Sequence, residues 1–495
     1  MYTVKCGIIN GSVVAVRIVV VLLCLCARVK GQPMDANGIS GPGALKPPYD
    51  AGGKKLFFIR NISVTGNKHT KDYIVKRELL FKEQDSIVLN ELVDQFELSR
   101  EQLINTRLFN TVVIRLKGFE GYGVDIEVEV TERWYIFPVP YFNLVDRNFQ
   151  TWADQGYSLS RINYGLKFIH FNTTGRKDQL NLFVISGYTK QLLLSYNQPY
   201  ADKSLKYGYG FSVGYSGVKE INVNTVDNKQ LFLKSDSIKF AGKFLQENMT
   251  VNFQVNYRPK LRTNHVFQVG YNWVKIDPVV LDKNPQYLSK DGGTAVHYPE
   301  FAYILKYVNA DYAPYMQKGQ IAQINFLRRG VTQDVGMWLL KIKGTQAWKL
   351  PKNYSYAASA GAVIKLPFHQ PYTQQRMFGY GDFYLRGLEK YVIDGALGLV
   401  VNQTLRKKVA DFNFRLPILS KTHDHIPLRI YLKTYADAGI SYNKNSVNNP
   451  LDNRFLYTGG VGLDVVTLYD LVLRFEGSVN QRGEAGFFFH VKNEF

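Results

Sequence analysis

The sequence predicts a β protein with a small α+β domain: a sixteen-stranded antiparallel transmembrane β-barrel, preceded by one domain of β-α-α-β-β order. The chain of 495 residues contains 33 Tyr, 31 Phe and 41 Gly, a mixture typical of twisted strands with an aromatic outer face. Outside the N-terminus, no apolar run approaches the ~18 residues that a spanning helix needs. From residue 157 to the end, apolar and polar residues alternate with the period of a β-strand.

Residues 1–31 are predicted to be a secretory signal peptide. Lys5 and Arg17 precede the apolar stretch Ile18–Ala27, which is too short to span a bilayer, and small residues lie just beyond it. We expect cleavage near Gly31, and an uncleaved anchor is the alternative. All three cysteines lie inside this segment, so the mature chain requires neither disulfide nor thiolate chemistry.

Residues 32–54 are rich in Gly and Pro and predict a disordered lead-in. Residues 55–133 predict the small domain, with strand-like stretches at both ends and with Thr70 and Asn90 each placed to cap a helix. A sheet of this size leaves one edge strand open to pair with another chain. The expected strands are Leu56–Val64, Leu108–Leu116 and Tyr122–Val130, and the expected helices are Tyr73–Leu80 and Leu92–Ile104.

This domain resembles a POTRA domain, the polypeptide-transport-associated module. The resemblance rests on Ile62–Asn67 in the first strand, Leu108–Asn110 at the start of the second and Val128–Arg133 at the end of the third. It covers the whole of residues 55–133. Family members often carry two or more copies, whereas one is found here, and a generic α+β domain is the alternative.

Residues 157–495 predict strands with one apolar and one hydrated face. In Leu205–Tyr215 every odd-numbered residue is apolar, and every even-numbered residue is Lys, Gly or Ser. Tyr354–Leu366, Leu428–Ile440 and Ala485–Phe495 alternate in a similar way. Because a slip of one residue would invert each face, repeated alternation is a strong indication of strands, and closure into a barrel lets such strands cross a bilayer. A soluble β-sandwich is the alternative.

Connector lengths agree with a barrel whose first strand lies near residues 157–171. They predict short periplasmic turns on one side, long external loops on the other and both mature termini in the periplasm. Residues 219–230 are an exception, a long connector on the short side. Residues 134–156 are an extra strand or a lead-in, and we favour the lead-in. The short connectors are Gly187–Lys190, Arg258–Thr263, Leu350–Lys352 and Leu468–Asp470; the long ones are Asp277–Tyr298, His369–Asp394 and Ser441–Asn453.

A loop between the expected strands 11 and 12, Met377–Leu388, contains Arg386 and Gly387. It resembles the Arg-Gly loop of the BamA/TamA outer-membrane assembly-factor superfamily, which joins POTRA domains to a sixteen-stranded barrel and folds this loop back into the lumen. The family's Asp-x-Gly on strand 13 is matched by Asp437 and Gly439, and strand parity alone places Asp437 in the lumen. Since a guanidinium fork suits a carboxylate, we predict that Arg386 contacts Asp437 and locks the loop.

Two further features bear on the resemblance. Strand 12 departs from the family pattern, because Asn402–Arg406 lacks the acidic residue that relatives often carry there and offers Arg386 no second carboxylate. The terminal Phe495 fits the assembly signal that many barrels carry on their last strand.

The resemblance implies outer-membrane barrel assembly and insertion, or polypeptide translocation across the outer membrane. The implied partners are unfolded outer-membrane or secreted polypeptides, outer-membrane lipids and periplasmic accessory proteins. Insertase and secretion transporter both remain open. An alternative from another class is a passive channel or structural barrel whose POTRA domain docks a periplasmic partner.

Other functions are not expected. The formal net charge is +20 at pH 7 without a compact Lys/Arg run, which favours basic side chains facing anionic lipid over nucleic-acid binding. None of the eight His lies in a nucleophile motif and no phosphate-binding glycine loop is visible, so we expect neither an enzyme nor a cofactor. His423–His425 lacks further ligands, so no metal site is expected.

Overall fold

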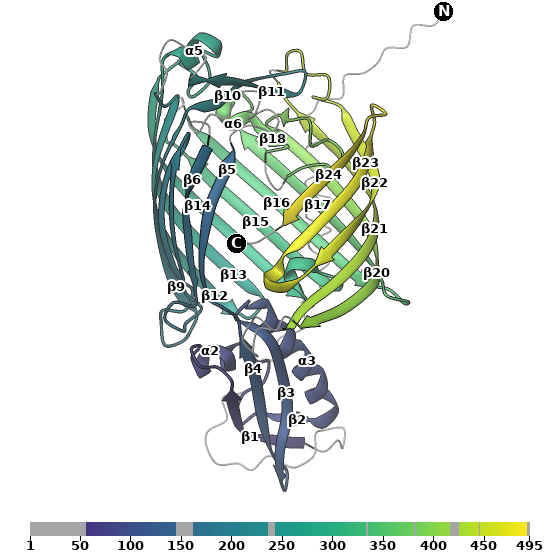
Figure 1. Cartoon of the computed structure of the whole chain (residues 1–495). Helices are drawn as coiled ribbons and strands as arrows, with labels where there is room; N and C mark the ends of the chain where they lie inside the picture. The colour runs from purple at the N-terminus through teal and green to yellow at the C-terminus, as the bar shows by residue number, and fades with distance from the viewer. Residues whose placement is uncertain are drawn as a thin grey trace, which may run out of the picture.

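The computed structural model describes residues 56–144, 162–235, 243–332, 335–380, 383–415, 425–444 and 446–492. A sixteen-stranded antiparallel sheet forms the barrel, and the small domain lies beneath one end of it (Figure 1). The predicted signal peptide and lead-in, together with Phe495 and His423–Asp424, lie outside the described residues. No helix in the described part of the chain is long and apolar enough to cross a membrane.

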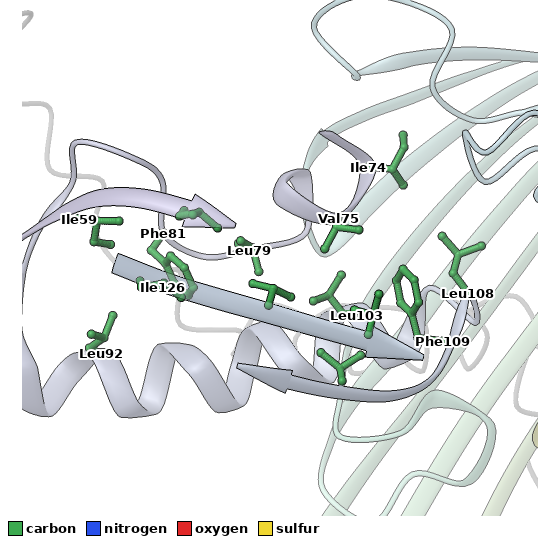
Figure 2. Packing of buried hydrophobic residues seen from close by; sticks show 14 of the residues in the cluster. Ile59, Ile74, Val75, Leu79, Phe81, Leu92, Leu103, Leu108, Phe109 and Ile126 are labelled. Atoms are coloured by element: carbon green, nitrogen blue, oxygen red, sulfur yellow. The ribbon is translucent and has the colours of Figure 1, made fainter. Parts of the chain in front are cut away.

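The small domain is a four-stranded sheet of order β2-β1-β4-β3 with two helices. Figure 2 shows its core, where Ile59 and Ile126 of the sheet and Leu92 and Leu103 of the longer helix are fully buried or nearly so. The central pair β1 and β4 is parallel, and the other pairs are antiparallel. The elements are β1 (Leu56–Thr65), α2 (Asp72–Arg77), β2 (Ser86–Val88), α3 (Leu89–Asn105), β3 (Phe109–Glu120) and β4 (Gly123–Glu132).

Three details of this domain differ from the prediction. The short strand β2 lies between the helices, and its three residues are too few to show a period. Neither Thr70 nor Asn90 caps a helix as predicted, because Lys71 and Val88 occupy the N-cap positions without a side-chain cap and Asn90 lies inside α3. The amide and hydroxyl of Thr70 instead donate to Glu132, which ties the start of α2 to the end of β4.

The barrel strands have the predicted two faces. Phe211 and Phe253 point outward and are about half exposed, as expected of side chains that face lipid. On the opposite face Asn252, Gln254 and Asn256 hydrogen-bond to side chains of other strands inside the lumen. The strands are β5 (Ile136–Leu144), β6 (Ile162–Phe171), β7 (Gln179–Gly187), β8 (Lys190–Gln198), β9 (Tyr207–Val218), β12 (Gln246–Lys260), β13 (Thr263–Ile276), β14 (Ala295–Ala310), β15 (Gly319–Arg329), β16 (Met337–Lys349), β17 (Tyr354–Leu366), β20 (Leu397–Arg415), β21 (His425–Tyr442), β22 (Phe455–Val466), β23 (Val472–Asn480) and β24 (Ala485–Lys492).

The first barrel strand is β5, so the preference for a lead-in at residues 134–156 is wrong. β5 contains Pro138 and Pro140, which cannot donate to a ladder. β5 pairs only with β6 among the described strands, and prolines are tolerated on such an edge. The total of sixteen is unchanged, because residues 219–235 form a hairpin outside the barrel sheet.

Starting the count at β5 also corrects the connectors. Gly187–Lys190 joins β7 to β8 at the end of the barrel away from the small domain, so this short connector lies on the long-loop side. Residues 219–230 belong to the connector between β9 and β12 and lie on the same side, so they are no exception.

The long connectors pack against one another over the end of the barrel away from the small domain (Figure 1). The Thr225 and Tyr372 hydroxyls are 2.8 Å apart, and the Asn228 amide donates to Asp452. Contacts between three separate connectors therefore hold this cap together. Its elements are β10 (Glu220–Val226), β11 (Lys229–Lys234), α5 (Val279–Lys283), α6 (Tyr372–Gln375), β18 (Arg376–Phe378) and β19 (Ile393–Asp394); the 3-10 turns η3 (Ala313–Tyr315) and η4 (Leu468–Asp470) lie at the opposite end.

Three charged residues, the buried Glu78 and the partly buried Arg77 and Arg258, form a joint that fastens the small domain to the barrel turns. Glu78 is fully buried, and both its carboxylate oxygens accept from the guanidinium of Arg258, at the end of β12. Tyr200, in the turn between β8 and β9, donates to Glu78 at 3.0 Å. Arg77 donates to the carbonyl oxygens of Leu205 and Arg258. Burial raises the pKa of Glu78, but the cations Arg258, Lys177 and Arg77 outweigh it and lower that pKa to about 2.

Glu78→Gln is expected to loosen this joint by about 3 kcal/mol, because it leaves the largely buried Arg258 guanidinium without its anion. In the wild type the docked pKa lies below the ordinary 4.5, so Glu78 stabilises docking above pH 4.5, and this contribution is lost as the pH falls toward 2. Spin labels at Lys117→Cys and Lys352→Cys measure the distance between domain and barrel. At pH 7 the distribution of distances between the two labels should be broader in the variant than in the wild type.

Glu83→Gln is the matched control, since Glu83 pairs with Lys76 at 2.8 Å on the exposed surface of the same domain. Exposed pairs of this kind contribute about 0–1 kcal/mol, so the distribution of label distances should stay as narrow as in the wild type. An equally narrow distribution in Glu78→Gln would show that the pair of Glu78 and Arg258 does not hold the joint.

Candidate functional site

The lumen loop, described at residues 379–380 and 383–392, enters the barrel between β18 and β19, which pair with each other and close its base. Its apolar side chains anchor it. Phe383, Leu385 and Leu388 are buried against the inner wall, where Val400 of β20 and Leu456 of β22 meet them. Burial of this apolar surface holds the loop against the strands that follow it in the chain.

Arg386 and Asp437 meet inside the barrel, as predicted. The Arg386 Nε donates to one Asp437 oxygen at 2.9 Å, and its Nη2 pairs with the other. The backbone N–H of Arg386 donates to the same carboxylate at 3.0 Å. Asp437, on β21, is 3% exposed and Arg386 is 8% exposed. A paired, two-pronged contact of this kind fixes the direction of the loop as well as its position.

The remaining donors of Arg386 find neutral partners on β20. Nη1 donates to the Thr404 hydroxyl at 3.0 Å, and Nη2 also donates to the carbonyl oxygen of Gln403. The guanidinium carbon lies 4.1 Å from the ring centroid of Tyr435, a cation–π contact. Strand β20 thus offers Arg386 a hydroxyl and a carbonyl as acceptors, in agreement with the absence of an acidic residue at Asn402–Arg406.

Gly387 and Gly439 allow the loop to approach the wall closely. Gly387 has φ +89°, and a Cβ there would lie 2.8 Å from the Cβ of Ser478 on β23. A Cβ on Gly439 would lie 2.9 Å from the carbonyl oxygen of Leu399 and 3.2 Å from the Leu385 side chain. Side chains at these two positions would therefore push the loop off β21 and β23.

The lumen loop also contacts the last hairpin, β23 and β24, and sequence reasoning missed this contact. Asn480, at the end of β23, donates to the carbonyl oxygen of Gly387 at 3.2 Å. The Tyr391 hydroxyl donates to the Glu484 carboxylate at 2.8 Å, in the turn before β24. Neither pair has a recognisable spacing, because residues about 93 positions apart become neighbours only when the barrel closes.

A charge cluster of Lys433, Asp464 and Glu476 lies beside the loop, across β21, β22 and β23. The Lys433 Nζ donates to Asp464 at 2.5 Å and to Glu476 at 2.6 Å, and all three side chains are almost completely buried. The Tyr315 hydroxyl adds a bond to Asp464 at 2.9 Å. Strand parity placed Lys433 on the lumen face together with Asp437, but it did not reveal the two carboxylates.

Sequence comparison identifies the small domain. Residues 57–133 match the POTRA family, described as a surface antigen variable number repeat. A 99-residue stretch, 20% of the chain, is 32% identical to the outer membrane protein assembly factor BamA of Neorickettsia risticii (strain Illinois), covering 12% of that protein. These two matches support a BamA/TamA-type family for the chain. A second stretch, 35% of the chain, is 26% identical over 182 residues to BamA of Buchnera aphidicola subsp. Acyrthosiphon pisum (strain APS), covering 27% of that protein.

These matches thus span about an eighth and about a quarter of the two BamA proteins. Among solved structures, BamA from Haemophilus ducreyi lacking POTRA domains 1–3 is 15% identical with a TM-score of 0.47, over 88% of this chain and 83% of that one. CdiB from Escherichia coli is 11% identical with a TM-score of 0.47, over 98% and 99%. The POTRA match and the sixteen-stranded barrel indicate an outer-membrane location for the chain.

Proposed function

We propose that this chain is of the BamA/TamA type and that it inserts client β-barrels into the outer membrane or moves a polypeptide across it. One observation carries the proposal: within the described residues, β5 and β24 pair with no strand on their outer sides, so the barrel sheet has two edges. The two strands face each other across the front of the barrel (Figure 1). An open edge offers unpaired backbone groups that pair readily with an incoming strand.

The two edges are not equivalent. Pro138 and Pro140 deprive β5 of two backbone donors, whereas β24 contains no proline. We therefore place the templating edge on β24, where a client strand adds by backbone hydrogen bonds. Arg386 and Asp437 support this edge, since the loop that they lock also contacts β23 and the turn before β24.

The POTRA domain supplies an earlier contact on the same route. In its sheet the two outer strands are β2, with three residues, and β3, with twelve. Only β3 is long enough to hold an extended client segment by regular pairing. We propose that β3 receives the client in the periplasm and that the seam between β5 and β24 then opens laterally.

Photo-crosslinking tests the role of β24. A photoreactive residue at Phe487, which is 72% exposed on β24, should trap unfolded outer-membrane or secreted polypeptides in living cells. The matched control is Phe301 on β14, equally lipid-facing but flanked by β13 and β15. Adducts at neither position, or equal adducts at both, would favour a passive channel or structural barrel.

Depletion of the chain distinguishes the two routes within this proposal. Broad loss of outer-membrane barrels from the membrane proteome supports insertion, and loss of one exported protein supports secretion.

A further inference from the structure

Three potential metal ligands converge where the lumen loop meets the last two strands. They are Glu389 of the lumen loop, Glu476 of β23 and His490 of β24. One ligand atom from each lies within 4.8 Å of the other two. The His490 Nε2 is 3.4 Å from the Glu389 Oε1 and 3.4 Å from the Glu476 Oε2. The three atoms are buried, and none has a hydrogen-bond partner among the described residues.

The distances suit a shared ion better than direct hydrogen bonds. Charge-assisted N–H···O bonds are about 2.7–2.9 Å long, so 3.4 Å is too long for either pair. Two ligands that each lie about 2.0–2.1 Å from a tetrahedral Zn²⁺ are separated by about 3.3–3.4 Å. Both nitrogen–oxygen separations have this length in the structure.

Surrounding contacts orient the two carboxylates toward this point. The Glu389 Oε2 accepts from the backbone N–H of Gly387 at 2.7 Å, which leaves Oε1 directed at His490. The Glu476 Oε1 accepts from Lys433 at 2.6 Å, which leaves Oε2 directed at the same nitrogen, and Glu476 is 0% exposed. Ligands oriented in this way, by hydrogen bonds to the atom that does not bind the metal, are typical of metal sites.

The local charge leaves room for a cation. Lys433 is already shared between Asp464 and Glu476, and Arg386 is paired with Asp437. Arg474, the cross-strand neighbour of His490, is the remaining cation on β23 near the cluster. Glu389 therefore adds a fourth carboxylate to Asp437, Asp464 and Glu476, against the three cations Lys433, Arg386 and Arg474.

We propose that Glu389, Glu476 and His490 bind one divalent transition-metal ion, preferentially Zn²⁺, which pins β24 to β23 and to the lumen loop. Two carboxylates and one imidazole are a ligand set that Zn²⁺ accepts, with a solvent molecule at the fourth position. The His490 side chain is 32% exposed, which gives the ion access from the lumen. Bound metal therefore opposes detachment of the edge strand, and the site does not depend on what the barrel transports or inserts.

Zinc titration of the purified full chain tests the site. The protein, without an affinity tag, is stripped with EDTA in detergent micelles and titrated with Zn²⁺ by calorimetry, and bound metal is counted by elemental analysis. We expect one equivalent in the wild type, loss of that equivalent in His490→Ala and Glu389→Gln, and its retention in His490→Cys, because a thiolate also binds Zn²⁺. Bound Co²⁺ should give the visible absorption of a tetrahedral site.

His265→Ala is the matched control, since His265 lies on β13 and contacts the Tyr303 hydroxyl instead of a carboxylate. It should keep one equivalent, and heat-modifiable migration on gels checks that every variant is a folded barrel. The proposal is overturned if the wild type binds no stoichiometric zinc, which would leave the three residues as an ion-pair cluster. It is equally overturned if folded His490→Ala and Glu389→Gln bind as much zinc as the wild type.

Discussion

Arg386→Ala is expected to release the lumen loop from the barrel wall. The substitution removes the fork that holds Asp437 and leaves that carboxylate, which is 3% exposed, without its cation. Breaking a buried pair by deleting one partner costs about 3–5 kcal/mol. We expect the loop to become sensitive to added protease in intact cells and the folded barrel to unfold at a lower temperature on gels.

Two further variants separate charge from geometry. Arg386→Lys keeps the positive charge but loses the planar fork, so it should recover only part of the protection. Arg376→Ala removes an exposed arginine from the base of the same loop and should leave the protease pattern unchanged. Unchanged protease resistance in Arg386→Ala would contradict the assignment of Arg386 as the lock.

Lys433→Met should destabilise the C-terminal strands of the barrel at least as strongly. The Lys433 amino group lies between Asp464 and Glu476, whose side chains are 1% and 0% exposed. Methionine keeps the length of the side chain but leaves two buried carboxylates facing each other, at a cost of about 3–5 kcal/mol or more. Urea titration of the folded barrel in micelles, followed by tryptophan fluorescence, measures the loss.

The control for this variant is Lys408→Met. The Lys408 amino group meets Asp411 at 2.8 Å in a partly exposed pair on β20, and such pairs contribute 0–1 kcal/mol. Its urea midpoint should match that of the wild type. A Lys433→Met barrel as stable as this control would show that the charge cluster is not needed to hold β21, β22 and β23 together.

Alternation along the chain was sufficient to locate most barrel strands. The expected strand Tyr354–Leu366 is identical with β17, and Asp437 faces the lumen as parity required. A strand with one face in lipid and one in a hydrated lumen must alternate apolar and polar residues, so its period is visible in the sequence without knowledge of the neighbouring strands. β5 was misjudged because its prolines are acceptable only on an edge, and edge position is a property of the whole sheet.

The sequence by itself determined the sixteen-stranded barrel, the POTRA domain in front of it and the pairing of Arg386 with Asp437, since each depends on a local period or on a motif. Only the tertiary structure decided that Lys433 lies between Asp464 and Glu476, that Glu78 holds the domain to the barrel, and that Glu389, Glu476 and His490 meet. These side chains come from different strands, turns and loops, and their distances are set by closure of the sheet and docking of the domain. Electrostatic contacts between such distant positions leave no period in the chain, because a single charged residue looks the same in sequence whether or not a partner faces it.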